Sequence, residues 1–207
     1  MAGIDPGFSS PCSVTFAVKD LAGNCYIVYN YYEPERDSHQ HAQAIRELIE
    51  SDNSPLFKLL QGKKPDLWVS GHDAFAKKDR YAIISNEVTF ADVFLQQGIY
   101  LTKAVTDRVP GWWAWKSLIP DKFFLFKGFC NDLVKEIQSA ESDKKHVEDL
   151  NGRGNDVNVP DHALDSTRYA IMSLFKPKEI KQPEVILPGT RADVLKQYQT
   201  IPAQIKF

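Results

Sequence analysis

The order of extended and helical patterns is the feature that most limits how this chain can fold. Three extended patterns follow one another at residues 3–7, 13–18 and 25–32, and the third is rich in β-branched and aromatic side chains. From residue 38 onward, amphipathic helical patterns alternate with short apolar stretches that are typical of buried strands. This order predicts an α/β fold with a mixed sheet, in which antiparallel hairpin strands come first and parallel strands follow, with helices on both faces.

The remaining elements and the end of the domain follow from the same patterns. We expect helices at residues 38–50, 89–97, 110–118, 129–140 and 161–175, and further strands at residues 66–70, 100–105 and 123–126. The stretch 141–159 is polar and rich in glycine, asparagine and aspartate, which predicts a loop. Prolines and lysines dominate beyond the last helix, so we expect one domain over residues 1–175 and an irregular C-terminal tail over residues 176–207.

Composition argues against several functional classes. The chain is 43% hydrophobic and 25% charged, and it contains neither an apolar window long enough to cross a bilayer nor a signal peptide, so we expect no membrane association. Its three cysteines show no CxxC spacing, which favours reduced thiols over a zinc site. A strand pattern directly after the initiator Met suggests a domain cut from a longer protein. The net charge of −2 lacks the basic excess that nucleic-acid-binding proteins usually carry, although bound metal cations can supply positive charge locally.

Four aspartates stand where the ends of strands and helices would bring them together. Asp5 ends the first strand pattern, and Asp73 follows the strand expected at residues 66–70. Asp161 begins the last long helix, and Asp165 lies one turn further along the same face. Each aspartate alone is more typical of a turn former, a helix cap or an intrahelical ion pair. Together they are oxygen donors of the kind that Mg²⁺ prefers, and two such ions could activate a water molecule and stabilise the leaving oxygen of a phosphodiester.

The second of these acids has two competitors nearby in the sequence. Asp66 would lie at the opposite end of its strand, and Asp79 lies in a charged loop. The expected strand geometry therefore favours Asp73.

Two segments carry a resemblance to a known family. Residues 3–7 (GIDPG) and 161–170 (DHALDSTRYA) resemble the nuclease domain of the large terminase subunit of tailed bacteriophages, which belongs to the ribonuclease H-like superfamily. Residues 98–111 look like the strand and arginine-containing loop of that family, and residues 129–137 look like its penultimate helix. The similarity thus runs in order over most of residues 3–175. The chain departs from some relatives at Pro160, where they carry an extra acid, so one ligand is either missing here or supplied by another residue.

The resemblance implies a function and a set of partners. It implies an endonuclease that cleaves double-stranded viral DNA during genome packaging with two Mg²⁺ or Mn²⁺ ions. It assigns Asp5, Asp73 and Asp161 to a metal-binding triad and Asp165 to an auxiliary catalytic acid. Implied partners are an ATPase motor domain of the same full-length protein, the portal protein and the small terminase subunit, all in the host cytoplasm. This chain contains no GxxxxGK[ST] phosphate loop, so the motor would lie outside it.

Basic residues near the acids are candidates for DNA contacts. Lys77, Lys78 and Arg80 follow Asp73 and could hold the DNA backbone near the metals, although an ordinary solvated charge run would look the same. Arg108 precedes a tryptophan-rich stretch, for which packing into the core is the commoner explanation.

Two further features adjoin the proposed site. His72 and His162 lie next to proposed ligands, where they would orient water, donate a proton or simply be neighbours. The loop at residues 141–159 is either a flap over the substrate or a solvated connection.

Other functions fit parts of the same pattern. A Holliday-junction resolvase would share the sheet and the first and last acids, and a preference for four-way junctions over linear duplex would distinguish it. A non-catalytic docking domain of a packaging motor would be expected to lose the acids, which this chain keeps. An actin-like phosphotransferase would need a second large lobe, for which the chain is too short.

Overall fold

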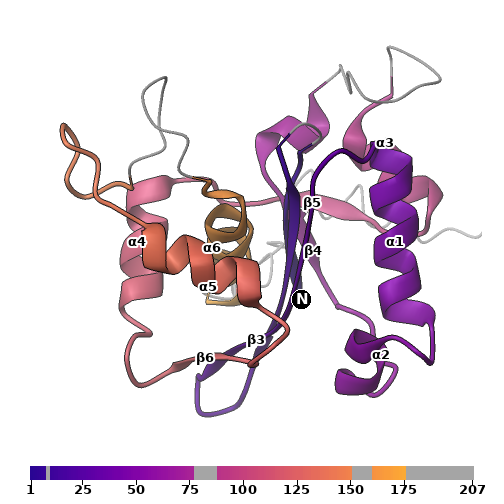
Figure 1. Ribbon diagram of the computed structural model, residues 1–207, viewed down its shortest axis with the longest axis horizontal. Helices are drawn as coiled ribbons and strands as arrows, with labels where there is room; N and C mark the ends of the chain where they lie inside the picture. The colour runs from indigo at the N-terminus through magenta and orange to yellow at the C-terminus, as the bar shows by residue number, and fades with distance from the viewer. Residues whose placement is uncertain (8–9, 77–87, 151–159, 176–207) are drawn as a thin grey trace, which may run out of the picture. The chain divides into compact units, whose positions relative to one another are not determined.

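A six-stranded mixed sheet forms the centre of the unit Met1–Lys176 (Figure 1). The computed structural model describes residues 1–7, 10–76, 88–150 and 160–175. Its strands are β1 (Ala2–Asp5), β2 (Cys12–Lys19), β3 (Cys25–Glu33), β4 (Trp68–Ser70), β5 (Leu101–Lys103) and β6 (Phe123–Leu125). They run in the order β5-β4-β1-β2-β3-β6 across the sheet. β1, β2 and β3 pair antiparallel, whereas β4, β5 and β6 join in parallel, so the predicted mixed sheet is confirmed.

Helices cover both faces of this sheet, as predicted. They are α1 (Ser38–Glu50), α2 (Pro55–Leu59), α3 (Phe90–Gln96), α4 (Arg108–Lys116), α5 (Asn131–Ser139) and α6 (His162–Leu174). In Figure 1, α1, α2 and α3 lie on one side of the sheet, and α4, α5 and α6 lie on the other. Two apolar cores correspond to these two faces. None of the helices among the described residues has the length and apolar character needed to span a membrane.

Local sequence explains where the first helix begins. Asp37 caps α1 by accepting a hydrogen bond from the backbone N–H of Gln40, whose side chain accepts one in return from the backbone N–H of Asp37. Ala42, Ile45 and Ile49 then recur at helical spacing and are buried against the sheet. This helix has the bounds that its sequence pattern predicts.

Helix α6 lies unusually close to the sheet because of a glycine. A Cβ atom at Gly3 in β1 would lie 2.1 Å from the carbonyl oxygen of Ser166, which leaves no room for any other residue. Below the helix, buried hydroxyl and amide groups join strand to helix: Ser166 bonds to Ser13 and to Thr15 at 2.8 Å, and Asn30 donates to both of these strand residues. This close packing sets the distance between α6 and β1. It therefore also fixes where the acids at the N-terminus of α6 lie relative to β1.

The structure differs from the sequence-based expectations in a few elements. Helix α2 and a 3-10 turn at His72–Phe75 were not expected, and α4 begins at Arg108 rather than at residue 110. The three cysteines are free and buried, which agrees with reduced thiols. The expected tail over residues 176–207 lies outside the described residues, so the division of the chain at residue 175 stays a prediction.

Candidate active site

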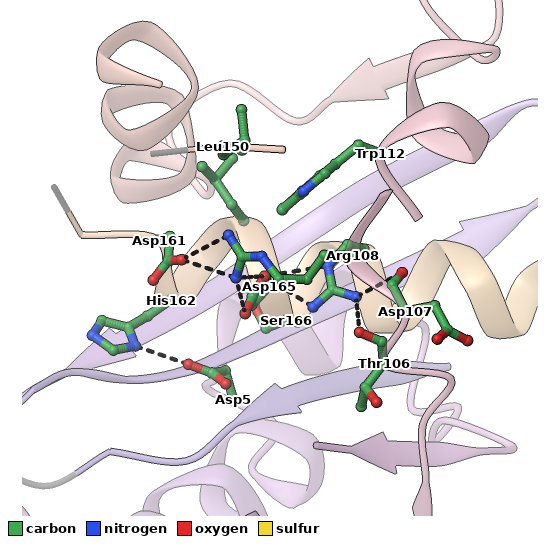
Figure 2. Close-up of polar contacts among 12 residues, drawn as sticks. Asp5, Thr106, Asp107, Arg108, Trp112, Leu150, Asp161, His162, Asp165 and Ser166 are labelled. Atoms are coloured by element: carbon green, nitrogen blue, oxygen red, sulfur yellow. Dashed lines mark hydrogen bonds and ion pairs between the residues drawn. The ribbon is translucent and has the colours of Figure 1, made fainter. Parts of the chain in front are cut away.

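Three of the four proposed acids meet at one edge of the sheet. Asp5 is the last residue of β1, while Asp161 and Asp165 lie at the start of α6, which packs across that strand. His162 links the two elements, because its Nδ1 lies 2.8 Å from an Oδ2 of Asp5, 157 positions away in the sequence (Figure 2). Residues far apart in the chain are thus brought into one polar cluster, as the pattern of strand and helix ends predicts.

Burial is the main cause that shifts the pKa values of two acids in this cluster. Burial, with smaller contributions from the neighbouring carboxylates of Asp165 and Asp161, raises the pKa of Asp5 to about 6, against the opposing effect of the hydrogen bond to His162. Burial likewise raises the pKa of Asp165, against the opposing effect of two nearby arginines. The hydrogen bond to Asp5 raises the pKa of His162. In this partly buried space these two acids therefore ionise less readily unless a positive charge lies close to them.

Asp161 stands at the N-cap position of α6 but does not cap it. Its side chain makes no capping hydrogen bond, and instead its Oδ2 accepts from the guanidinium of Arg108 at 3.2 Å. The ordinary explanation of an aspartate at a helix start, which is that it satisfies the first N–H groups, therefore does not apply to Asp161.

Glu136 of α5 performs that capping from a different helix. Its Oε2 accepts from the backbone N–H groups of Ala163 and Leu164 at 2.8 and 3.0 Å, and its Oε1 accepts from the Tyr32 hydroxyl at 2.6 Å. The side chain is almost fully buried, and burial raises its pKa. Because Glu136 satisfies the helix end, the carboxylate of Asp161 is left to face the polar cluster.

Arg108, at the start of α4, lies among the acids. Its Nη1 donates to both Asp161 and Asp165 at 3.2 Å (Figure 2), and its Nε donates to Asp149 at 3.0 Å. Asp149 is held in turn by the indole N–H of Trp112 at 2.8 Å. The sequence makes Arg108 a candidate for DNA contact; in this structure its guanidinium points into the acid cluster, and the contact with DNA stays a prediction.

A second arginine fixes Asp165. Arg168 is 1% exposed and donates to Oδ1 of Asp165 at 3.0 Å and to the backbone oxygen of Thr106 at 2.9 Å. The pair lies within one helix, as expected, but it also ties α6 to the chain entering α4.

The sequence did not single out Glu136 or Asp149, and Trp112 was noted only as part of the tryptophan-rich stretch after Arg108. Glu136 lies on a predicted helix and Asp149 in a predicted loop, and neither position carries a local signal that would reveal partners 27 to 41 residues away. Only the packed fold shows their contacts.

Comparison with known proteins agrees with this architecture. No family model and no curated protein matches the chain. Among solved structures, the nuclease domain of the bacteriophage P22 large terminase superposes with a TM-score of 0.61 at 15% identity, over 84% of this chain and 80% of that one. The nuclease domain of g2p, the large terminase of bacteriophage SPP1, with bound Mn, gives 0.55 at 16% identity, over 82% of each chain. The chain has the fold of large terminase nuclease domains.

The likeness extends to a longer terminase. The large terminase of a thermophilic bacteriophage, in complex with ATP-gamma-S, superposes with a TM-score of 0.59 at 20% identity. The match covers 82% of this chain but only 38% of that one, so this chain spans well under half of the longer protein. The ribonuclease H-like fold class expected from the sequence is confirmed.

Asp73, the fourth proposed acid, lies apart from the other three. Asp73 lies in the 3-10 turn that follows β4, beyond the same edge of the sheet as Asp5, since β4 runs parallel to β1 with Ser70 beside Ile4. Its side chain is exposed, and so is that of His72. Asp66 precedes β4 and therefore lies at the opposite edge, as expected. Thus Asp73 shares the edge of the other acids without joining their hydrogen-bonded cluster.

Some of the predicted basic residues are not placed. Lys77, Lys78 and Arg80, together with the competing acid Asp79, lie outside the described residues. Their contacts with DNA stay predictions.

The acids suit a divalent ion in the kind of ligand that they offer. Asp5, Asp161 and Asp165 offer carboxylate oxygens, the ligands preferred by Mg²⁺ and Mn²⁺, at one end of the sheet. Within residues 1–7, 10–76, 88–150 and 160–175, no three acidic, histidine or cysteine side chains are arranged so that they could hold one metal ion. The oxygens of Asp161 and Asp165 face Arg108, and that of Asp5 faces His162. The guanidinium of Arg108 and the imidazole of His162 therefore already pair with these acids.

Proposed function

We propose that this chain is a divalent-metal-dependent endonuclease that hydrolyses double-stranded DNA. The main observation behind the proposal is that Asp5, Asp161 and Asp165 lie together at one edge of the sheet, in a chain that has the fold of terminase nuclease domains. The absence of a capping bond from Asp161 supports it, because this carboxylate faces the polar cluster and not the first N–H groups of α6.

In the proposed mechanism the acids bind the metal ions, neighbouring side chains position these acids, and basic residues hold the DNA. Asp5 and Asp161 would hold Mg²⁺ or Mn²⁺, two ions in all, with Asp73 as the third ligand and Asp165 as an auxiliary acid. The bound ions would supply an activated water and stabilise the leaving oxygen of the phosphodiester. His162 orients the carboxylate of Asp5 through its hydrogen bond, and Glu136 fixes the helix end that presents Asp161. The basic residues Lys77, Lys78, Arg80 and Arg108 would hold the DNA backbone.

The biological setting is part of the same proposal. Under it, the chain is the nuclease part of a terminase that cuts viral DNA during genome packaging in the host cytoplasm. An ATPase motor domain of the same full-length protein, a portal protein and a small terminase subunit would be its partners. The partial coverage of the large terminase from the thermophilic bacteriophage supports a longer parent protein.

A cleavage assay on the purified chain tests the activity. Supercoiled plasmid should be nicked and linearised with Mn²⁺ or Mg²⁺, and a chelator should stop the reaction. Asp5→Ala, Asp161→Ala and Asp73→Asn should each abolish cleavage while circular dichroism shows an unchanged fold. Asp52→Asn, at an exposed position, is the matched control and should cut like the wild type.

Two results would change the proposal. Cleavage by Asp5→Ala and Asp161→Ala at the wild-type rate would refute it. Normal cleavage by Asp73→Asn alone would remove only the third ligand. Linear duplex and four-way junctions should be compared in the same assay, because a strong preference for junctions would favour a resolvase.

A further inference from the structure

The position of Arg108 has a consequence for metal binding. Its side chain is 16% exposed and is shared by three carboxylates from two parts of the chain: Asp149, which precedes α6, and Asp161 and Asp165, which begin it. Both terminal nitrogens of the guanidinium donate to the same Oδ2 of Asp161 at 3.2 Å. The side chain thus satisfies the carboxylate that the proposed function assigns to a metal ion.

The arginine is held there by contacts outside the proposed metal ligands. Asp149 is 3% exposed, and its Oδ1 accepts from the Trp112 indole, from the backbone N–H of Leu150 and from Nε of Arg108, at 2.8, 2.8 and 3.0 Å. The ring of Trp112 also lies under the guanidinium, 5.4 Å from its carbon. A side chain fixed by an anchor of this kind has a defined resting position, unlike a surface arginine that reaches into solvent.

The charges of the cluster explain why a cation rests there. Four carboxylates, those of Asp5, Asp149, Asp161 and Asp165, are gathered in a partly buried space, where unpaired charge is costly. Arg168 is fully engaged with Asp165 and with backbone oxygens of the chain entering α4. Arg108 is the cation that reaches Asp161 among the described residues.

We propose that Arg108 is a built-in counter-cation of the acid cluster, and that a divalent ion must displace its guanidinium from Asp161 in order to bind. This inference rests on the proposed metal site. In the displaced state Arg108 turns its guanidinium away from Asp161 and Asp165 and gives up part of its contact with Asp149. Metal affinity in the absence of DNA is therefore set in part by the strength of the Arg108 pairing.

Mn²⁺ titration of the DNA-free chain tests this directly, by calorimetry or by the electron paramagnetic resonance signal of free Mn²⁺. Arg108→Gln removes the competing charge and should bind Mn²⁺ roughly tenfold more tightly or better, since a unit charge near a double charge opposes binding strongly. Asp149→Asn releases the anchor and should tighten Mn²⁺ binding to a smaller degree. Arg46→Gln is the matched control, because Arg46 pairs with Glu50 on the exposed surface of α1, and it should bind Mn²⁺ like the wild type.

Thermal melting gives a second readout that does not depend on cleavage. Without metal, Arg108→Gln should melt below the wild type, because the acids lose their counter-charge. With saturating Mn²⁺ its melting temperature should rise by more than that of the wild type, because a ligand stabilises the folded state in proportion to its affinity. A variant that lost only packing would melt lower with and without Mn²⁺ by the same amount.

The outcomes separate this inference from the proposed function. Mn²⁺ binding of equal strength by the wild type, Arg108→Gln and Asp149→Asn would overturn the inference and leave the metal site standing. A failure of all three proteins to bind Mn²⁺ would refute the metal site, and the inference with it. Binding by Arg108→Gln but not by the wild type would be its strongest support.

Discussion

Removal of the Glu136 carboxylate should destabilise the chain and loosen the site. The side chain is 3% exposed and accepts three hydrogen bonds, from the N–H groups of Ala163 and Leu164 and from the hydroxyl of Tyr32. Glu136→Ala would leave three donors without their acceptor, each at a cost of about 1–3 kcal/mol. Relief of the buried carboxylate and entry of water would offset part of this cost, so we expect a net loss of about 3–5 kcal/mol.

That loss is large compared with the stability of a typical domain, which is about 5–15 kcal/mol. For a unit of this length, each kcal/mol lowers the melting temperature by about 2–4 °C, so Glu136→Ala should melt about 6–20 °C below the wild type. Glu136→Gln keeps an oxygen for the two N–H groups and offers its amide to the oxygen of Tyr32. It should therefore cost only about 1–2 kcal/mol.

Differential scanning fluorimetry measures the melting temperature, and amide hydrogen exchange at Ala163 and Leu164 measures the helix end itself. Both amides should exchange faster in Glu136→Ala, and DNA cleavage should fall because Asp161 adjoins the loosened turn. Glu47→Ala is the matched control, since Glu47 is an exposed glutamate of α1. Unchanged protection of the two amides, or melting no more than about 2 °C below the wild type, would refute the reasoning.

Two more predictions follow from the packing and charge of the site. Burial is the main cause that raises the pKa of Asp5 to about 6. Folding therefore takes up a proton between about pH 4 and pH 6, and the contribution of this carboxyl to stability falls as the pH rises through that window. Without metal, Asp5→Asn should therefore be more stable than the wild type at pH 7.5 by up to about 3 kcal/mol, and this difference should disappear near pH 4. Urea unfolding across this pH range measures the difference in stability, and a difference that stays constant with pH would contradict the prediction. Gly3→Ala would place a Cβ 2.1 Å from the Ser166 oxygen and force α6 away from β1, which should cost about 1–3 kcal/mol and reduce cleavage about a hundredfold. Gly23→Ala is the control: it lies in the open turn of the hairpin at φ +84° and should lower stability without affecting cleavage. Equal cleavage by Gly3→Ala and Gly23→Ala would contradict the role of the close packing between α6 and β1.

Most of the fold could be predicted from the sequence because local patterns and global packing agree. Helix α1 was predicted to the residue, since a capping box and apolar residues at helical spacing mark it. Helix α2 was missed although Ser54 caps it and Pro55 opens it, because five residues are too few to show a period. The start of α4 was placed two residues late, at the proline of its first turn rather than at Arg108.

The candidate site was only partly accessible to sequence reasoning. The end of β1 and the start of α6 can be placed at one edge of the sheet from topology alone, which predicts that Asp5, Asp161 and Asp165 lie together. The pairing of Arg108 with Asp149 and the capping of α6 by Glu136 depend on how a loop and a neighbouring helix pack. No periodicity in the sequence encodes those contacts, and they decide which carboxylates of the cluster are already occupied.

Crystals of the chain grown with Mn²⁺, with diffraction recorded at the manganese absorption edge, would test most directly whether these acids bind the ions of a nuclease. Anomalous peaks are expected within coordination distance of the carboxylates of both Asp5 and Asp161, with the guanidinium of Arg108 withdrawn from Asp161. Manganese bound elsewhere, or acids that keep their pairing with Arg108 and His162 at saturating Mn²⁺, would contradict this expectation.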